Sequence, residues 1–217
     1  MVSVSILNGD LARLAETAAD ISASGAEYLH FDVMDGCFVD NISFGLPVLE
    51  SLDGCTDLPL DVHLMICDPL HYAERFCSAG ADILTFHIES DSDAAEVIRT
   101  VHQLGVRVGI AVSPATPIEK VYPYLDLLTP EDLVLVMTVV PGLGGQSFMP
   151  ETVQKIRDLR SELQRRGRSL HIEVDGGINA ETGAVCRNAG ADILVAGSYL
   201  LRAENMKQAV ASLRDGV

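Results

Sequence analysis

The chain has 217 residues, of which 48% are hydrophobic and 21% charged, and its formal net charge is −16. The apolar content excludes a disordered chain, and the strong negative charge argues against DNA or RNA as a partner. No apolar run is long enough to cross a bilayer, and the first residues lack a signal peptide's pattern, so we expect a cytoplasmic protein with no membrane contact.

Short β-like runs recur along the chain, separated by helical patterns. A Gly-Ala-acid turn precedes three of these runs, at Gly25, Gly80 and Gly190, which indicates one βα unit used repeatedly. The eight runs are residues 2–7, 28–34, 60–65, 83–88, 106–112, 133–139, 170–174 and 193–196. Eight such units with short connections favour an α/β fold of the (β/α)₈ TIM-barrel type, as one domain over residues 1–217. A doubly wound open sheet is the alternative, although it usually has fewer strands.

The helical patterns carry recognisable boundary signals. Asp68-Pro69 is typical of an N-cap followed by proline at the first helical position, and residues 116–119 are interpreted as a capping box. Two apolar stripes predict amphipathic helices. One stripe ends near Gly25 and the other lies between Pro150 and Gly167; their members are Leu11, Leu14, Ala18 and Ile21, and Val153, Ile156, Leu159 and Leu163.

Polar side chains share one face of several strands, because residues two apart point the same way. The second run places His30, Asp32 and Met34 on one face. The third and seventh runs repeat the pattern; their polar-face residues are Asp61, His63, Met65, His171, Glu173 and Asp175. An antiparallel sandwich with one wet face would give the same alternation. Crossover helices cover the outside of a parallel barrel, so we expect this face to line the lumen.

Several carboxylates and imidazoles in one lumen need charge compensation, which a divalent cation supplies. His30, Asp32, His63 and Asp175 can converge on one metal ion per chain, with Zn²⁺ the first choice and Fe²⁺, Mn²⁺ or Co²⁺ as alternatives. Hydrogen-bonded packing of a lumenal histidine is the competing interpretation. Three methionines fall beside these residues and suit either a wall that shields reaction intermediates or core packing: Met34, Met65 and Met137.

Glycine-rich loops follow the last three strands. Their glycines and neighbours are Gly142, Leu143, Gly144 and Gly145 after the sixth run, Gly176 and Gly177 after the seventh, and Gly197 and Ser198 after the eighth. Each loop alone fits a tight turn. Together, on the rim where barrels bind phosphate, they predict a site where backbone N–H groups hold a phosphate despite the acidic chain.

The motifs together resemble the ribulose-phosphate 3-epimerase family, nearly from end to end. They are SIL at 5–7, HFDVMDG at 30–36, DVHLM at 61–65, VMT at 136–138, PGLGGQ at 141–146, EVDGGI at 173–178 and AGS at 196–198. The resemblance implies a cytoplasmic, metal-dependent isomerase of the pentose phosphate pathway. This enzyme interconverts D-ribulose 5-phosphate and D-xylulose 5-phosphate, and its metal is often zinc.

The resemblance also implies roles for single residues. Asp32 and Asp175 would be the acid/base pair, and with His30 and His63 they would hold the metal. The substrate would contact Ser5, His63, Gly142, Leu143, Gly144, Gly145, Asp175, Gly176, Gly177, Gly197 and Ser198. Inversion at C3 through an enediolate requires proton carriers on both faces of the carbon, which is why two opposed carboxylates are expected.

Four positions near the predicted mouth depart from the family pattern: Asp40, Ser113, Val140 and Leu143. They leave open a 3-epimerase of a related ketose phosphate, such as D-allulose 6-phosphate. Phosphate-binding lyases and decarboxylases are a competing class, but they commonly use a lumenal lysine and none of the eight runs contains one. A sugar-phosphate sensor would not need two carboxylates and a metal. A homo-oligomer and a lid formed by residues 35–47 are both compatible with the sequence.

Overall fold

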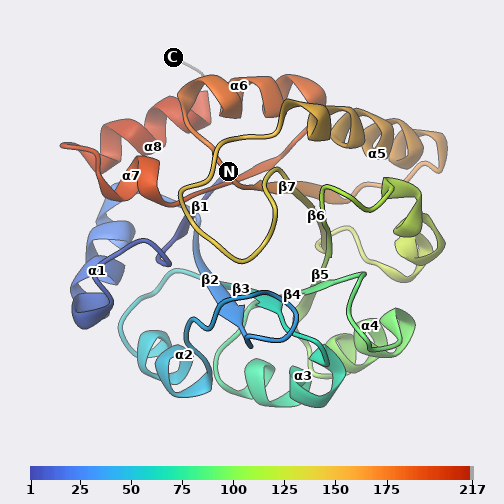
Figure 1. The fold of residues 1–217 in the computed structure, drawn as a ribbon, viewed down its shortest axis with the longest axis horizontal. Helices are drawn as coiled ribbons and strands as arrows, with labels where there is room; N and C mark the ends of the chain where they lie inside the picture. Colours follow the sequence, from blue (N-terminus) through green and yellow to red (C-terminus); the bar gives the residue numbers. More distant parts are fainter. Residues whose placement is uncertain (216–217) are drawn as a thin grey trace.

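The computed structural model describes residues 1–215, and its eight parallel strands form a closed barrel in the order β1 to β8. Helices surround the ring of strands, and the chain runs around the barrel once (Figure 1). The strands are β1 Val2–Ser5, β2 Tyr28–Met34, β3 Leu60–Met65, β4 Ile83–His87, β5 Arg107–Val112, β6 Leu133–Met137, β7 His171–Asp175 and β8 Ile193–Ala196. The predicted (β/α)₈ barrel is confirmed, and the open sheet is excluded because β1 pairs with β8.

Helices connect successive strands on the outside of the barrel. The α-helices are α1 Leu14–Ser24, α2 Leu46–Asp53, α3 Pro69–Ser78, α4 Ala94–Gln103, α5 Val153–Arg165, α6 Ala180–Ala189, α7 Ser198–Leu201 and α8 Met206–Asp215. The 3₁₀ turns are η1 Leu11–Arg13, η2 Ile118–Lys120, η3 Tyr122–Leu127 and η4 Pro150–Thr152. Between β5 and β6, η2 and η3 take the place of an α-helix.

Most of the predicted helix boundaries hold, and two details were wrong. Asp68 caps α3 by accepting a hydrogen bond from the His71 backbone, and Gly25 ends α1 in the left-handed conformation. The capping box expected at 116–119 is absent, because Pro117 precedes the short turn η2 and no side chain caps it. Leu11 lies in η1 and is 51% exposed, since α1 begins only at Leu14.

The described residues form three hydrophobic clusters, and the two largest follow the alternation along the strands. The outward faces of the strands pack against the helices, and Leu29, Phe31 and Val62 are buried in that layer at 5% exposure or less. A second cluster fills part of the lumen; it consists of Tyr28, Ile83, Ala111, Leu133, Leu135, Met137, Val139 and Ile193. A third, small cluster consists of Met34, Val39 and Met65. Polar side chains at other inward positions build the site.

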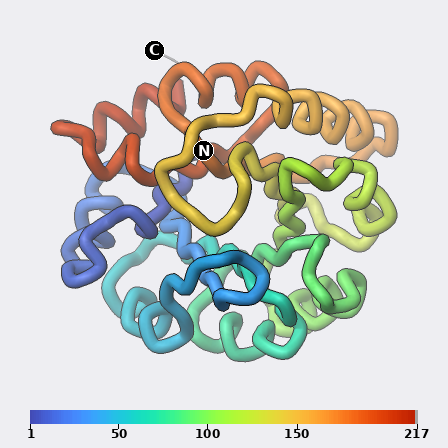
Figure 2. The backbone as a smooth tube through the Cα atoms, in the orientation of Figure 1, coloured from blue at the N-terminus to red at the C-terminus, as the bar shows by residue number. Residues whose placement is uncertain are grey.

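Two loops meet over the mouth of the barrel. The loop after β6 crosses the opening, and the loop after β2 faces it from the opposite rim (Figure 2). The Asn41 side chain donates a hydrogen bond to the Gly142 carbonyl at 3.0 Å, so the loops touch. The loop after β2 is folded on itself through a bridge between Asp35 and Ile42.

Candidate active site

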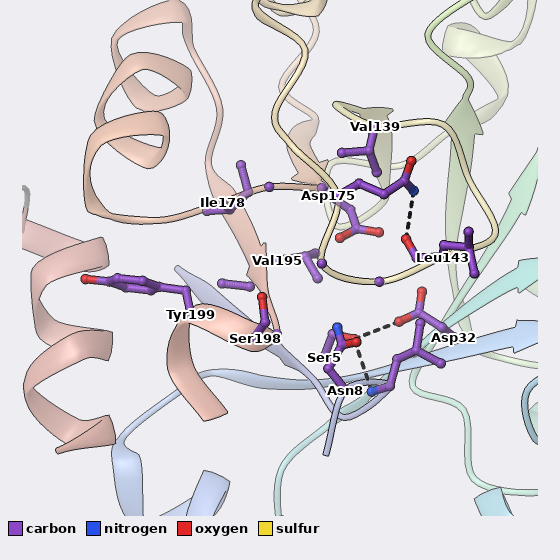
Figure 3. A pocket seen from close by; sticks show the side chains of 18 of the residues that line it. Ser5, Asn8, Asp32, Val139, Leu143, Asp175, Ile178, Val195, Ser198 and Tyr199 are labelled. Atoms are coloured by element: carbon purple, nitrogen blue, oxygen red, sulfur yellow. Dashed lines mark hydrogen bonds between the residues drawn. The ribbon is translucent and has the colours of Figure 1, made fainter. Parts of the chain in front are cut away.

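A cavity of about 490 Å³ opens at the carboxyl ends of the strands, where the predicted site residues gather. Asp32 and Asp175 enter it from different walls (Figure 3). The other predicted residues that line it are Ser5, Met34, Met65, Met137, Gly142, Leu143, Gly144, Gly145, Gly176, Gly177, Gly197 and Ser198. His30 and His63 do not line the cavity; they are fully buried beneath it.

The four predicted metal ligands come together beneath the cavity. One ligand atom from each of His30, Asp32, His63 and Asp175 lies within 4.8 Å of all the others. The closest pairs join Asp32 Oδ1 to His30 Nε2 at 3.2 Å and to His63 Nδ1 at 3.1 Å. Asp175 Oδ2 lies 4.0 Å from His63 Nδ1. Two imidazole nitrogens and two carboxylate oxygens are a donor set that suits Zn²⁺ and similar cations, so this cluster can hold one metal ion.

The surroundings of His30 favour a positive charge at this cluster. Its Nε2 atom is buried and has no hydrogen-bond partner within residues 1–215, although Asp32 Oδ1 is only 3.2 Å away. Burial opposes a charged ring, yet the charges of Asp61 and Asp32 raise the pKa of His30 well above its ordinary value. An orphaned ring nitrogen beside two carboxylates is the arrangement expected of a metal ligand.

His30 is oriented from below by Asp61. The Nδ1 atom of His30 lies 2.7 Å from Asp61 Oδ2, and the same oxygen accepts a hydrogen bond from the Ser3 hydroxyl at 2.8 Å. Register explains the contact, since His30 is directly opposite Asp61 in the β2–β3 pair. A carboxylate that accepts from Nδ1 leaves Nε2 as the metal-facing nitrogen.

Glu173 lies deeper in the lumen and is fully buried. Neither of its carboxylate oxygens has a hydrogen-bond partner among the described residues. Burial, and next the negative charge of Asp61, raise its pKa well above the ordinary value, which favours the neutral form. Glu173 can share a small cluster with His30 and Asp61 beneath the main site.

The two aspartates of the cavity differ in their electrostatics. Burial alone would raise the pKa of Asp32, but His30 and His63 lower it far below its usual range. The Ser5 hydroxyl also donates to its Oδ2 at 2.8 Å. Burial, and next the negative charge of Asp32, raise the pKa of Asp175 to about 7. Near neutral pH Asp32 therefore favours the ionised form, whereas Asp175 is only partly ionised.

The glycine loops approach the cavity where side chains would not fit. Gly177 has a φ of +65°, and a Cβ there would lie 2.5 Å from the Phe148 backbone nitrogen. Among the described residues that line the cavity, Arg202 carries the one cationic side chain. The rim thus combines backbone groups with a single cation, in an otherwise acidic chain.

The sequence patterns gave no role to Asp61, Glu173 or Arg202, nor to two further residues beside the site, His87 and Glu89. Burial lowers the pKa of His87 to about 4, so its ring is neutral at pH 7. Glu89 is held ionised: burial would raise its pKa, but hydrogen bonds from His87, Thr116 and Ser113 lower it to about 2. The alternation along β4 places Thr85 and His87 on the inward face with Glu89 two residues on, but it does not indicate their contact with His63.

Comparison with known proteins places the chain among sugar-phosphate enzymes. A family model described as the ribulose-phosphate 3 epimerase family matches residues 1–201. The chain is 45% identical over 214 residues to a ribulose-phosphate 3-epimerase of Mycobacterium tuberculosis, covering 99% of this chain and 91% of the relative. It is 43% identical over 217 residues to a cytoplasmic isoform of ribulose-phosphate 3-epimerase from Oryza sativa, covering 100% and 93%.

The fold is shared more widely than the sequence. A crystal structure of 3-hexulose-6-phosphate synthase superimposes with a TM-score of 0.73 at 17% identity, covering 100% of this chain and 99% of the other. At that identity the likeness shows the barrel fold alone. No helix among the described residues is long and apolar enough to span a membrane.

Proposed function

The chain belongs to the ribulose-phosphate 3-epimerase family and is an isomerase, and on that premise we propose that it interconverts D-ribulose 5-phosphate and D-xylulose 5-phosphate by inverting C3. The observation that carries the proposal is the meeting of Asp32 and Asp175 at one cavity with opposite protonation preferences. A proton carrier on each face of C3 is what inversion requires. The single domain and cytoplasmic location expected from the sequence remain part of this proposal, the latter supported by the name of the rice relative.

His30, Asp32, His63 and Asp175 would hold one divalent cation at the base of the cavity. When bound, the cation supplies a Lewis acid for the oxygens that become negative when the proton leaves C3. The orphaned Nε2 of His30 and the charge it favours support this assignment. Zinc is our first choice because of the nitrogen and oxygen donors, with Fe²⁺, Mn²⁺ and Co²⁺ as alternatives.

Asp32 and Asp175 would carry out the two proton transfers at C3, one residue removing a proton and the other supplying one. Asp32 favours the ionised form and begins as base for one direction, while Asp175 favours the protonated form and delivers a proton from the other side. The roles reverse for the opposite direction, so the pair titrates as a unit. Met34, Met65 and Met137 line the cavity at 4% exposure or less and would keep water from the carbanionic intermediate.

The phosphate would be bound at the far end of the cavity, by the loops after β6, β7 and β8. Gly176, Gly177, Gly197 and Ser198 border that end, and Arg202 adds a positive charge. Backbone N–H groups bind phosphate well because they carry no competing negative charge. Ser5, His63, Gly142, Leu143, Gly144 and Gly145 complete the proposed contacts around the sugar. His63, buried beneath the cavity, would contact the sugar only through the metal centre.

The central test is proton exchange at C3 with a panel of ketopentose and ketohexose phosphates in D₂O. We expect deuterium at C3 of both recovered substrate and product, with D-ribulose 5-phosphate turned over fastest. Unlabelled sugars would contradict proton abstraction. A higher kcat/KM for D-allulose 6-phosphate would reassign the substrate but keep the chemistry.

Metal dependence is tested separately. Purified protein should contain about one divalent metal per chain, and a chelator should abolish epimerisation while leaving the far-ultraviolet circular dichroism unchanged. Adding back Zn²⁺ or Co²⁺ should restore activity. Full activity in metal-free protein would remove the Lewis acid from the mechanism.

A further inference from the structure

His63 is connected to a carboxylate by way of a second histidine. Its Nε2 atom lies 2.9 Å from His87 Nε2, and His87 Nδ1 lies 3.0 Å from Glu89 Oε2. Both rings are fully buried. The three side chains therefore form one hydrogen-bonded chain that starts at the ligand cluster and ends at the rim of the barrel.

The two rings meet through their edges. Their centroids are 5.0 Å apart and their planes are inclined by 27°, while the nitrogens are only 2.9 Å apart. Such a short nitrogen–nitrogen distance requires the N–H of one ring to point at the lone pair of the other. Phe38, from the loop after β2, packs against His87 with ring centroids 4.8 Å apart.

Glu89 sets the direction of the chain. Its other oxygen, Oε1, accepts a hydrogen bond from the Ser113 backbone at 2.8 Å. An ionised carboxylate can only accept, so Nδ1 of His87 carries the proton and donates it. In a neutral ring Nε2 is then the acceptor, and Nε2 of His63 must be the donor.

The polarity leaves Nδ1 of His63 without a proton. That lone pair faces Asp32 Oδ1 at 3.1 Å, so two acceptors point at each other in a buried place. A cation between them satisfies both. Metal-binding histidines generally donate their second N–H to an acceptor that fixes ring orientation and tautomer, and the polarity here provides such an acceptor.

We propose that His87 and Glu89 are positioning residues that hold His63 in the Nε2–H tautomer, so that its Nδ1 lone pair faces the metal. The inference rests on the proposed metal centre and extends it to residues that do not touch substrate. The two histidine ligands are then oriented in similar ways. Asp61 accepts directly from His30, whereas Glu89 acts on His63 through His87.

Glu89 is anchored by the loop after β5. Lys155 donates to the carbonyls of Ser113, Pro114 and Thr116 at 2.6 to 2.8 Å, and this holds the loop whose Ser113 N–H binds Glu89. The acceptor at the end of the chain is therefore built on helix α5 as well as on the strands. Rigid support of this kind is what a positioning residue needs.

The first experiment compares metal affinity of Glu89→Gln with that of the wild type, by competition with a chelator for Zn²⁺. The amide has one acceptor where the carboxylate has two, so its NH₂ group can donate to His87 and reverse the chain. We expect affinity to fall about 10- to 100-fold. Glu119→Gln removes an exposed negative charge near the same loop and should bind like the wild type.

A pair of variants at His87 separates hydrogen-bond polarity from packing. The amide of His87→Gln can accept from His63 and donate to Glu89, so it should stay close to wild-type affinity. His87→Leu cannot accept and should lose about 10- to 100-fold. Circular dichroism and thermal unfolding of each variant show that the barrel is intact.

The tautomers can be read directly from ¹⁵N chemical shifts of the histidine rings in the Zn²⁺-loaded wild type. We expect His63 protonated on Nε2 and His87 on Nδ1. The opposite tautomer on His87, or unchanged affinity in both Glu89→Gln and His87→Leu, would overturn the positioning role of His87 and Glu89 but leave the proposed metal centre standing. A wild type that binds no divalent cation would overturn the metal centre itself, and the chain with it.

Discussion

The two sides of the barrel lumen carry different side chains, and the two aspartates of the cavity lie on different sides. Strands β1 to β4 turn Ser5, Asp32, His63 and His87 inward, whereas β5, β6 and β8 turn Ala111, Leu135, Met137 and Val195 inward. We call these the polar side and the apolar side. Asp175 stands on β7, between the two apolar strands β6 and β8.

This difference explains why two identical side chains behave differently. Asp32 has two imidazoles and a serine hydroxyl within hydrogen-bond distance, and its pKa is lowered. Asp175 is paired with Met137 and Val195 on the neighbouring strands, and burial, then the negative charge of Asp32, raise its pKa. Environments that push two carboxyl pKa values apart are how one site obtains an acid and a base.

The largest expected effect comes from removing either carboxylate. Asp32→Asn and Asp175→Asn should each lower kcat by two to four orders of magnitude, roughly the range for loss of a general acid or base. Steady-state kinetics in both directions measures this, with metal content determined for each variant. Near-normal turnover in either variant would remove that residue from the proton transfer and break the comparison.

Truncating the apolar side should affect stability far more than chemistry. The exposed fraction of Leu135 is 0%, and its side chain does not line the cavity. Leu135→Ala should lower the free energy of unfolding by about 2 to 5 kcal/mol through lost burial and a cavity. Denaturant titration gives this value, and kcat of the folded variant should change little. A severe loss of kcat without loss of stability would show that the two sides are not separable.

The smallest expected effect is a pH dependence at Glu89. Its pKa in the folded protein is about 2, below its ordinary value of 4.5, so its ionised form stabilises the fold. For a lowered pKa, that contribution is present above pH 4.5 and is lost progressively as pH falls toward 2.

The difference in unfolding midpoint between wild type and Glu89→Gln should therefore be largest above pH 5 and shrink as the pH falls below 4.5. Denaturant titrations at several pH values measure it. Subtracting one midpoint from the other cancels the contributions of most other titrating groups, because the two proteins share them. A difference that stays constant from pH 5.5 to pH 3 would contradict the assignment.

Much of the barrel could be predicted because the information is local. Alternation placed His30 and Asp32 on one face, and β2, β3 and β8 have the predicted bounds. The glycine loops were found in the same way, from their positions after strands. The prediction of a capping box at 116–119 was wrong because a proline before a short 3₁₀ turn gives the same sequence pattern as the start of an α-helix.

The ligand cluster was also within reach of the sequence, but the groups that orient it were not. His30, Asp32, His63 and Asp175 stand out as ionisable residues on strand faces, and their roles stay predictions. His87 and Glu89 lie at the end of a strand whose other inward residues, Ile83 and Thr85, give no alternation of charge. Their importance depends on the contact with His63, which no local pattern contains.

The order of residues along the chain determined which side chains share a strand face, because a strand repeats every two residues. Only the closed barrel decided which faces meet. The β2–β3 register sets His30 opposite Asp61, and the β3–β4 register sets His63 opposite Thr85, which brings His87 within reach. Closure then brings Asp175 across to Asp32. Such pairings join residues far apart in sequence, and their geometry comes from strand register and barrel closure, which no local pattern records.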